Sequence, residues 1–149
     1  LEKTSHPAIQ AVQGDATSMP EFRKASFDLV FSNSVIEHLY TLENQQKMAA
    51  EILRVGKSHF IQTPNAYFPI EAHYALPFAQ YYPKALLHFI LTQTKLSRLK
   101  RWSPAEASQY QDEIRLITKS EMRALFPGSA LLKEKVLGLT KSFTAHNLG

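Results

Sequence analysis

Small and polar residues directly follow three apolar segments of the chain, and they are the first candidates for a binding site. The three polar groups are Gly14-Asp15-Ala16, Ser32-Asn33-Ser34 and Thr63-Pro64-Asn65. In an open parallel sheet, ligands bind outside the carboxyl ends of the strands. If the three segments are neighbouring strands, these residues form one polar rim that can hold a ligand. Turns are polar in most proteins, so ordinary turns would produce the same pattern.

An acid and a histidine next to this rim could carry acid–base chemistry. Glu37 and His38 follow the second polar group at the expected start of a helix. An imidazole titrates near neutral pH, so His38 could act as a general base on an acceptor hydroxyl. The same two residues could equally be a structural cap or a substrate contact.

Composition excludes several classes of site. The chain has no cysteine, which excludes disulfides and thiolate metal sites and favours a reducing compartment, so a cytoplasmic location is expected. The five glycines are never closer than ten residues apart, so neither a G-x-G-x-x-G turn nor a P-loop exists. His6, His59 and His88 lack ligand spacing, and H-E-x-x-H is absent, so no metal is expected. Neither a signal peptide nor a membrane span is predicted.

The net charge of +4 comes from one part of the chain. The segment from Ala72 to Ala105 contains no acid, whereas the rest of the chain has 12 bases and 13 acids. The bases of this segment are Lys84, Lys95, Arg98, Lys100 and Arg101. Because the basic character is local, we expect no nucleic-acid partner.

The length of 149 residues suits a single domain, and the apolar pattern predicts an α/β fold. A strand, a helix and a strand in succession form a βαβ unit, and an antiparallel hairpin closes the chain. The predicted strands are Ala8–Gln13, Phe27–Phe31, His59–Thr63, Leu131–Leu137 and Ser142–His146. The predicted helices cover about Thr41–Val55, with Gly56 as a C′ glycine, and Thr118–Phe126, which opens on a capping box.

Residues 65–105 interrupt this pattern and are predicted to be an inserted helical lid. The loop Asn65–Pro83 is rich in proline and aromatic residues, and an amphipathic helix is expected over Lys84–Trp102. In a functional interpretation, His73, Tyr67 and Tyr74 close an acceptor site and the basic helix binds an anionic group or a membrane surface. In the alternative, the aromatic side chains fill a gap and the bases form a solvated face.

Four segments in order resemble the class I S-adenosylmethionine-dependent methyltransferases of the small-molecule type. They are GDATSMP, FDLVFSNSVIEHL, HFIQTPN and KEKVLGLTKSFTAH, and FPIEAHYALPFAQYYP extends the resemblance. The resemblance implies a partial Rossmann-like sheet, mostly parallel, with a C-terminal antiparallel hairpin and a helical insertion. It also implies S-adenosylmethionine as the cofactor.

The same resemblance assigns roles to residues on the rim. Asp15 would accept a hydrogen bond from the adenine amino group, and Ala16 would present its backbone N–H beside the ring. Asn33 would place its backbone carbonyl against the methionine amino group, with Ser32 and Ser34 lining the sulfonium. On the acceptor side, the predicted catalytic residues are those named above: Glu37, His38 and His73.

Two departures from the family pattern affect these expectations. The glycine-rich loop after the family's first strand and the acid after its second have no counterpart, so a truncated methyltransferase domain over residues 1–149 is predicted. No N-P-P-[YF] motif follows the family's fourth strand, so a small-molecule or sugar-like acceptor is expected rather than a nucleobase.

Two hypotheses about function follow. In the first, the chain is part of an enzyme that transfers a methyl group from S-adenosylmethionine. In the alternative, it is a non-catalytic methyltransferase-like module that binds a partner or a membrane surface through residues 84–102. Either way, an unpaired strand edge near Ile9 to Val12 predicts self-association.

Overall fold

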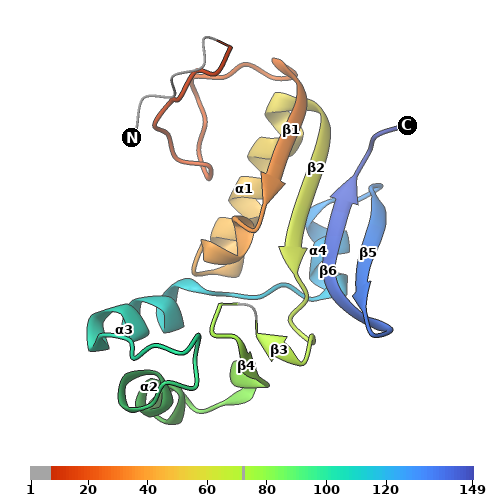
Figure 1. Cartoon of the computed structure of the whole chain (residues 1–149). Helices are drawn as coiled ribbons and strands as arrows, with labels where there is room; N and C mark the ends of the chain where they lie inside the picture. Colours follow the sequence, from red (N-terminus) through yellow and green to blue (C-terminus); the bar gives the residue numbers. More distant parts are fainter. Residues whose placement is uncertain (1–7, 72) are drawn as a thin grey trace.

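The computed structural model describes residues 8–71 and 73–149, and its centre is a four-stranded mixed sheet (Figure 1). The strands lie in the order β1 (Phe27–Asn33), β2 (Gly56–Pro64), β6 (Leu139–His146) and β5 (Ala130–Val136). β1 and β2 are parallel, whereas β6 is antiparallel to both of its neighbours. Three strands therefore point one way, and the predicted α/β fold with its closing hairpin is confirmed.

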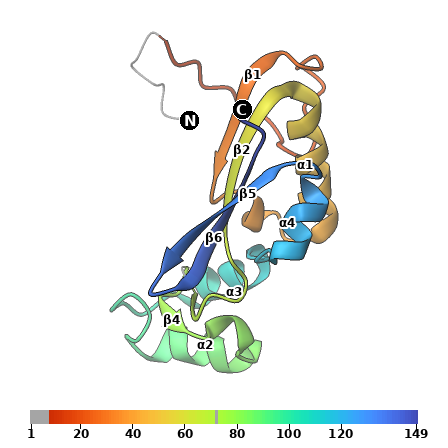
Figure 2. The same ribbon diagram turned by 90° about the vertical axis from the view of Figure 1, so that its right-hand side faces the viewer.

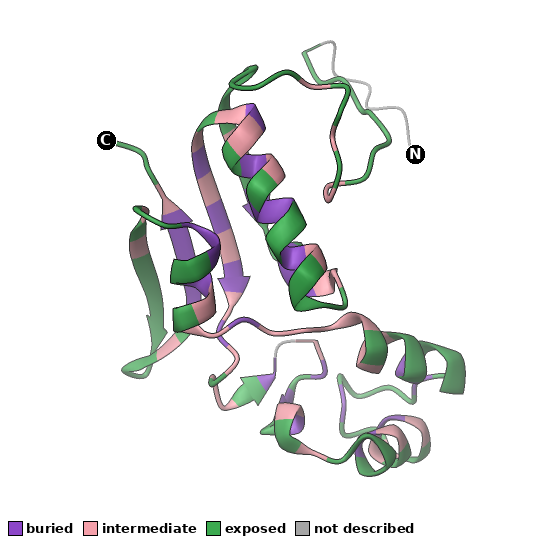
Figure 3. Ribbon diagram, turned by 180° about the vertical axis from the view of Figure 1, so that it is seen from behind, coloured by how far each residue is buried: buried purple, intermediate pink, exposed green. Residues whose placement is uncertain are grey.

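Helix α1 (Leu42–Val55) connects the two parallel strands. Thr41 caps its first turn by accepting a hydrogen bond from the Asn44 backbone N–H at 3.2 Å. Its buried residues form one stripe that faces the sheet (Figure 3): Gln45, Met48, Ala49, Ile52 and Val55.

Gly56 joins α1 directly to β2. A Cβ there would lie 2.8 Å from Val30 Cγ2, so this close approach to β1 requires glycine. Its backbone is extended, with a φ of −93°, and it is the C-cap of α1 rather than the predicted C′ residue.

Helix α4 (Lys119–Leu125) begins at the predicted capping box, in which Thr118 and Glu121 bond each other's backbone N–H groups. α1 and α4 cover the same face of the sheet, and no described helix covers the other face (Figure 2). The main core lies between them: Ile36, Met48, Ala49, Ile52, Ile61, Ile117, Met122, Leu125, Phe126, Phe143 and Ala145. On the uncovered face, Phe27, Leu29 and Phe31 of the edge strand β1 are exposed.

A second layer lies beyond the carboxyl end of β2 (Figure 1). It consists of β3 (Ile70–Glu71), β4 (Leu76–Pro77), the 3-10 helix η2 (Ala79–Tyr81), α2 (Lys84–Gln93) and α3 (Pro104–Glu113). Its own core surrounds Trp102, whose indole N–H donates to Ser97 Oγ at 3.0 Å. Ser97 Oγ in turn donates to the Tyr74 carbonyl at 2.7 Å.

Two predicted elements are absent from the described residues. Residues 8–13 are exposed and form no strand, because β1 is the edge of the sheet and no described strand pairs along its outer side. The helix expected over Lys84–Trp102 ends at Gln93. A new helix begins after Ser103, which forms a capping box with Glu106.

Helices in the described part of the chain are all too short or too polar to cross a membrane.

Candidate active site

The fold brings the three predicted catalytic residues together. Glu37 and His38 lie in the 3-10 helix η1 (Ile36–His38), just after β1, and His73 lies between β3 and β4. One nitrogen or oxygen of each side chain lies within 4.8 Å of those of the other two. The two imidazoles face each other with 3.2 Å between their Nε2 atoms. Residues 35 positions apart in sequence thus form one cluster.

Glu71 orients His73. Its Oε1 lies 2.6 Å from His73 Nδ1, and its Oε2 accepts the Tyr74 backbone N–H at 2.8 Å. With Nδ1 donating its proton to this buried carboxylate, the Nε2 of a neutral His73 carries a lone pair toward His38. Sequence reasoning missed Glu71, although a carboxylate two residues before a histidine is a signal that could have found it.

Glu37 is fully buried in the wall of the cluster. Its Oε2 accepts a hydrogen bond from Thr63 Oγ1 at 3.0 Å, and its Oε1 has no hydrogen-bond partner among the described residues. Burial raises the pKa of the Glu37 carboxyl above its ordinary value, because desolvation disfavours the charged form. An uncompensated buried oxygen of this kind is costly, so its retention points to a functional role.

A buried amide network fixes the backbone around Glu37. The Arg115 backbone N–H donates to the Glu37 carbonyl at 2.8 Å. Gln45 Nε2 donates to the carbonyls of Ile36 at 3.1 Å and Arg115 at 2.8 Å. The Arg115 guanidinium donates to Gln45 Oε1 at 2.6 Å and pairs with Glu121. α1, η1 and the N-terminus of α4 therefore hold the cluster together.

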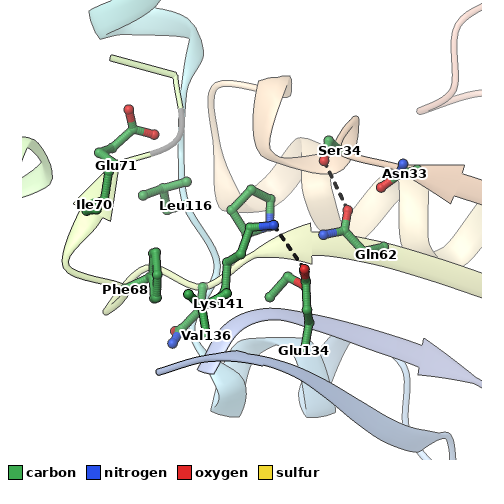
Figure 4. Close-up of a pocket in the computed structure, with 13 residues that line it drawn as sticks. Asn33, Ser34, Gln62, Phe68, Ile70, Glu71, Leu116, Glu134, Val136 and Lys141 are labelled. Carbon is green, nitrogen blue, oxygen red and sulfur yellow. Dashed lines mark hydrogen bonds and ion pairs between the residues drawn. The ribbon is translucent and has the colours of Figure 1, made fainter. Parts of the chain in front are cut away.

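A cavity of about 640 Å³ lies at the carboxyl ends of β1 and β2 (Figure 4). Glu71, which contacts His73, lines this cavity, whereas Glu37, His38 and His73 do not. Asn33, Ser34, Gln62 and Glu71 contribute polar groups to its wall. Ser34 has a φ of +54° and donates through Oγ to Gln62 Oε1 at 3.0 Å.

The predicted cofactor residues divide between two cavities and the surface. Ala16, Ser32 and Asn33 line a second cavity of about 430 Å³ on the α1 side of β1, and Ser34 lines the larger one. Ser32 Oγ is buried without a hydrogen-bond partner among the described residues.

Asp15 lines neither of these cavities. It is exposed, and its Oδ1 accepts the backbone N–H and the hydroxyl of Thr17, each at 2.8 Å. These hydrogen bonds lower the pKa of Asp15. The arrangement is an Asx turn, which forms without any ligand.

Sequence comparison supports the predicted resemblance over the first part of the chain. Residues 1–59 match the family described as a methyltransferase domain. Two uncharacterized proteins of Mycobacterium tuberculosis, from two strains, are each 35% identical to this chain over 51 residues. The matched segment covers 34% of this chain but only 17% of each relative's length.

One solved structure supports the fold of the chain. A proposed Zn-dependent alcohol dehydrogenase from Rhodobacter sphaeroides superposes with a TM-score of 0.52 at 13% identity, covering 91% of this chain and 63% of that one. A S-adenosylmethionine-dependent methyltransferase from Methanosarcina mazei has a TM-score of 0.47 at 15% identity, covering 89% and 63%.

The side chains of the other two predicted lid residues are not part of the cluster. Tyr74 is buried, and its ring packs against Trp102 in the second core, as the gap-filling interpretation predicts. Tyr67 is exposed, and it shares with Tyr74 a further cavity of about 380 Å³.

Two of the five bases in the predicted lid are paired with acids of α3. Lys84 lies 2.7 Å from Asp112, and Lys100 lies 3.7 Å from Glu106 and stacks over Trp102. The second layer thus neutralises part of its own positive charge.

Proposed function

We propose that this chain contributes the acceptor side, and part of the cofactor side, of an enzyme that methylates a hydroxyl group. The acceptor is a small-molecule or sugar-like compound. The observation that carries the proposal is the cluster of Glu37, His38 and His73, which Glu71 connects to the cavity at the carboxyl ends of β1 and β2. Its position is where α/β sheets bind their ligands, and the family match supports methyl transfer in general.

The residues around the smaller cavity fit S-adenosylmethionine. Ser32 Oγ is a buried polar atom without a partner in the described structure, and it lies beside the backbone of Asn33 and across from Ala16. A polar group of a bound nucleotide or amino acid would give Ser32 Oγ a hydrogen-bond partner. When bound, S-adenosylmethionine supplies an electrophilic methyl group on a sulfonium.

On the acceptor side, the chain's own residues bind and activate the hydroxyl. His38 accepts the hydroxyl proton, and its other ring nitrogen donates toward His73 Nε2. Glu71 holds the opposite side of the His73 ring and so stabilises the positive charge that develops. The rate of methyl transfer depends strongly on how the acceptor hydroxyl and the methyl group are aligned. Positioning of the hydroxyl by these side chains therefore contributes as much as removal of its proton.

Amide chemical-shift mapping of the 149-residue chain with S-adenosylmethionine tests the cofactor part, because it detects weak binding. We expect shifts centred on Ala16, Ser32 and Asn33 and none around Trp102. No shifts at saturating cofactor, or shifts confined to the second layer, would contradict the proposal. Turnover is then measured with labelled cofactor against a panel of hydroxylated small molecules and sugars.

We also propose that the uncovered face of the sheet is a contact between two copies of the chain. Phe31, at the edge of β1, is 64% exposed, and Leu29 points to the same face. Sedimentation should show association that Phe31→Lys weakens. Phe89→Lys, which changes an exposed phenylalanine on α2, is the control and should have no effect. A monomer at all concentrations would refute this contact.

Membrane contact through residues 84–102 is a weaker proposal. Leu96 and Leu99 are exposed in this basic segment, which favours an apolar surface as partner. The break after Gln93 removes the continuous amphipathic helix on which the idea was based. Co-sedimentation with anionic vesicles tests it, and loss of binding in Leu99→Ser is the expected result.

A further inference from the structure

Two features of the Glu37, His38 and His73 cluster also fit a bound cation. The Nε2 atoms of the two histidines point at each other across 3.2 Å, so both lone pairs can face one ion in place of the hydrogen bond between the rings. Glu37 Oε1 is buried in the same wall and has no hydrogen-bond partner among the described residues. Both features are accounted for if the three side chains share a cation.

The geometry agrees with ligands of one small metal ion. In tetrahedral zinc sites, Zn–N distances of about 2.0–2.1 Å place two ligand nitrogens about 3.3 Å apart. The 3.2 Å between the two Nε2 atoms is close to this separation. All three potential ligand atoms lie within 4.8 Å of one another, so small rotations of the side chains complete the set.

We propose that Glu37, His38 and His73 bind one divalent transition-metal ion, of which Zn²⁺ is the representative probe. Two imidazoles and one carboxylate are the ligand types that zinc and its neighbours prefer, whereas Mg²⁺ and Ca²⁺ prefer sites made of oxygen atoms. The spacing of histidines in the sequence predicted no metal site. It could not detect this one, because His73 lies between β3 and β4 whereas Glu37 and His38 lie in η1.

Glu71 positions one of the ligands. A histidine that binds a metal commonly donates its other ring N–H to a carboxylate, which fixes the ring and makes the ligand nitrogen more basic. Glu71 Oε1 makes this contact with His73 Nδ1 at 2.6 Å, and Glu71 is itself buried. Glu71 is therefore a positioning residue that acts through His73.

Three protein ligands leave one position of a tetrahedral ion open, as in catalytic zinc sites. An acceptor hydroxyl bound there would release its proton to solvent more readily, and the ion would replace His38 as the activating group. This last step rests on the proposed function, whereas binding of the ion does not.

Calorimetry with Zn²⁺ and absorption spectroscopy with Co²⁺ test the inference on the intact chain without any assay of turnover. We expect one ion per chain and a Co²⁺ spectrum typical of tetrahedral coordination. Glu71→Gln should keep this stoichiometry and weaken binding by roughly 10- to 100-fold. His38→Ala, His73→Ala and Glu37→Gln should weaken it further and abolish the tetrahedral spectrum.

His88→Ala is the matched control, because its imidazole lies on α2 outside the cluster. It should bind the ion like the wild type, and circular dichroism should show that every variant is folded. The inference is overturned if the wild type binds no ion. It is also overturned if binding survives in His38→Ala and His73→Ala, or is lost equally in His88→Ala. If methyl transfer is absent but the ion still binds as described, only the proposed function fails.

Discussion

The proposed acceptor side and the proposed cofactor side of the candidate site are held in place by different means. On the acceptor side, Glu37 and Glu71 are buried, and hydrogen bonds from β2, the Tyr74 backbone and His73 fix their carboxylates. On the cofactor side, Asp15 is exposed and makes only a local turn with Thr17. Buried contacts between distant elements fix the side chains of a site before a ligand binds. A side chain held only by a local turn reaches its final position when the ligand binds.

The cofactor side nevertheless has one strong attachment, to helix α1. Glu51 of α1 accepts the Met19 backbone N–H at 2.6 Å and pairs with Arg54. The Arg54 guanidinium also donates to the Met19 and Phe22 carbonyls, each at 2.7 Å. An ion pair at the surface of α1 thus holds the loop that carries Asp15, while buried hydrogen bonds together with the Arg115–Glu121 ion pair hold the acceptor side.

The largest expected effect is on the acceptor side. Gln45→Leu removes the donor to the Ile36 and Arg115 carbonyls and the acceptor for the Arg115 guanidinium. Each buried polar group left without a partner costs about 1–3 kcal/mol, so we expect a loss of about 3 kcal/mol in the free energy of unfolding. Urea denaturation measures it.

Gln46→Leu is the matched control, since the neighbouring glutamine is exposed and its replacement should change stability little. Equal losses in the two variants would show that the buried network does not support this side of the site.

The sequence predicted helix α1 and the C-terminal hairpin well. It predicted the end of helix α2 poorly. α1 was predicted because Thr41 and the apolar stripe are local signals, and the hairpin because the Leu137–Gly138 turn separates two apolar runs. The capping box at Ser103 and Glu106 is an equally local signal, and overlooking it extended the preceding helix to Trp102.

The roles of the candidate site residues stay predictions, whereas their assembly is seen only in the structure. The sequence singled out Glu37 and His38 by their place after the second polar group and His73 by its place in the aromatic loop, but only the chain path through β3 brings His73 to His38. The strand expected over residues 8–13 has the right apolar content but no described partner strand. A strand depends on its neighbours more than a helix does, so local sequence alone could not decide this point.

A pair of substitutions should separate the two sides of the site in the active enzyme. Asp15→Ala removes the hydrogen bond expected to the adenine amino group, so the affinity for S-adenosylmethionine should fall roughly ten- to hundredfold. His73→Ala should leave that affinity nearly unchanged and lower turnover. Calorimetry and a labelled-methyl assay measure the two quantities. If His73→Ala weakens cofactor binding as much as Asp15→Ala does, the division into two sides is wrong.

The smallest expected effect is a dependence on pH that belongs to the cofactor side. Hydrogen bonds from Arg54 lower the pKa of Glu51 from 4.5 to about 2 in the folded protein. A lowered folded-state pKa means that the unfolded chain binds the proton more readily, so the contribution is complete above about pH 5 and disappears as the pH falls toward 2. Because Arg54 is about one-third exposed, solvent screening limits it to about 1–2 kcal/mol.

Urea denaturation between pH 7 and pH 3 measures this contribution. The wild type should lose stability relative to Glu51→Gln as the pH falls, so the difference between the two proteins shrinks. Glu43→Gln is the matched control, because Glu43 on the same helix is paired only with the exposed Lys47. A difference between wild type and Glu51→Gln that stays constant with pH would mean that the ion pair does not hold the loop. The Asp15 turn would then have to be positioned by its local hydrogen bonds to Thr17 alone, and the contrast between the two sides would be sharper still.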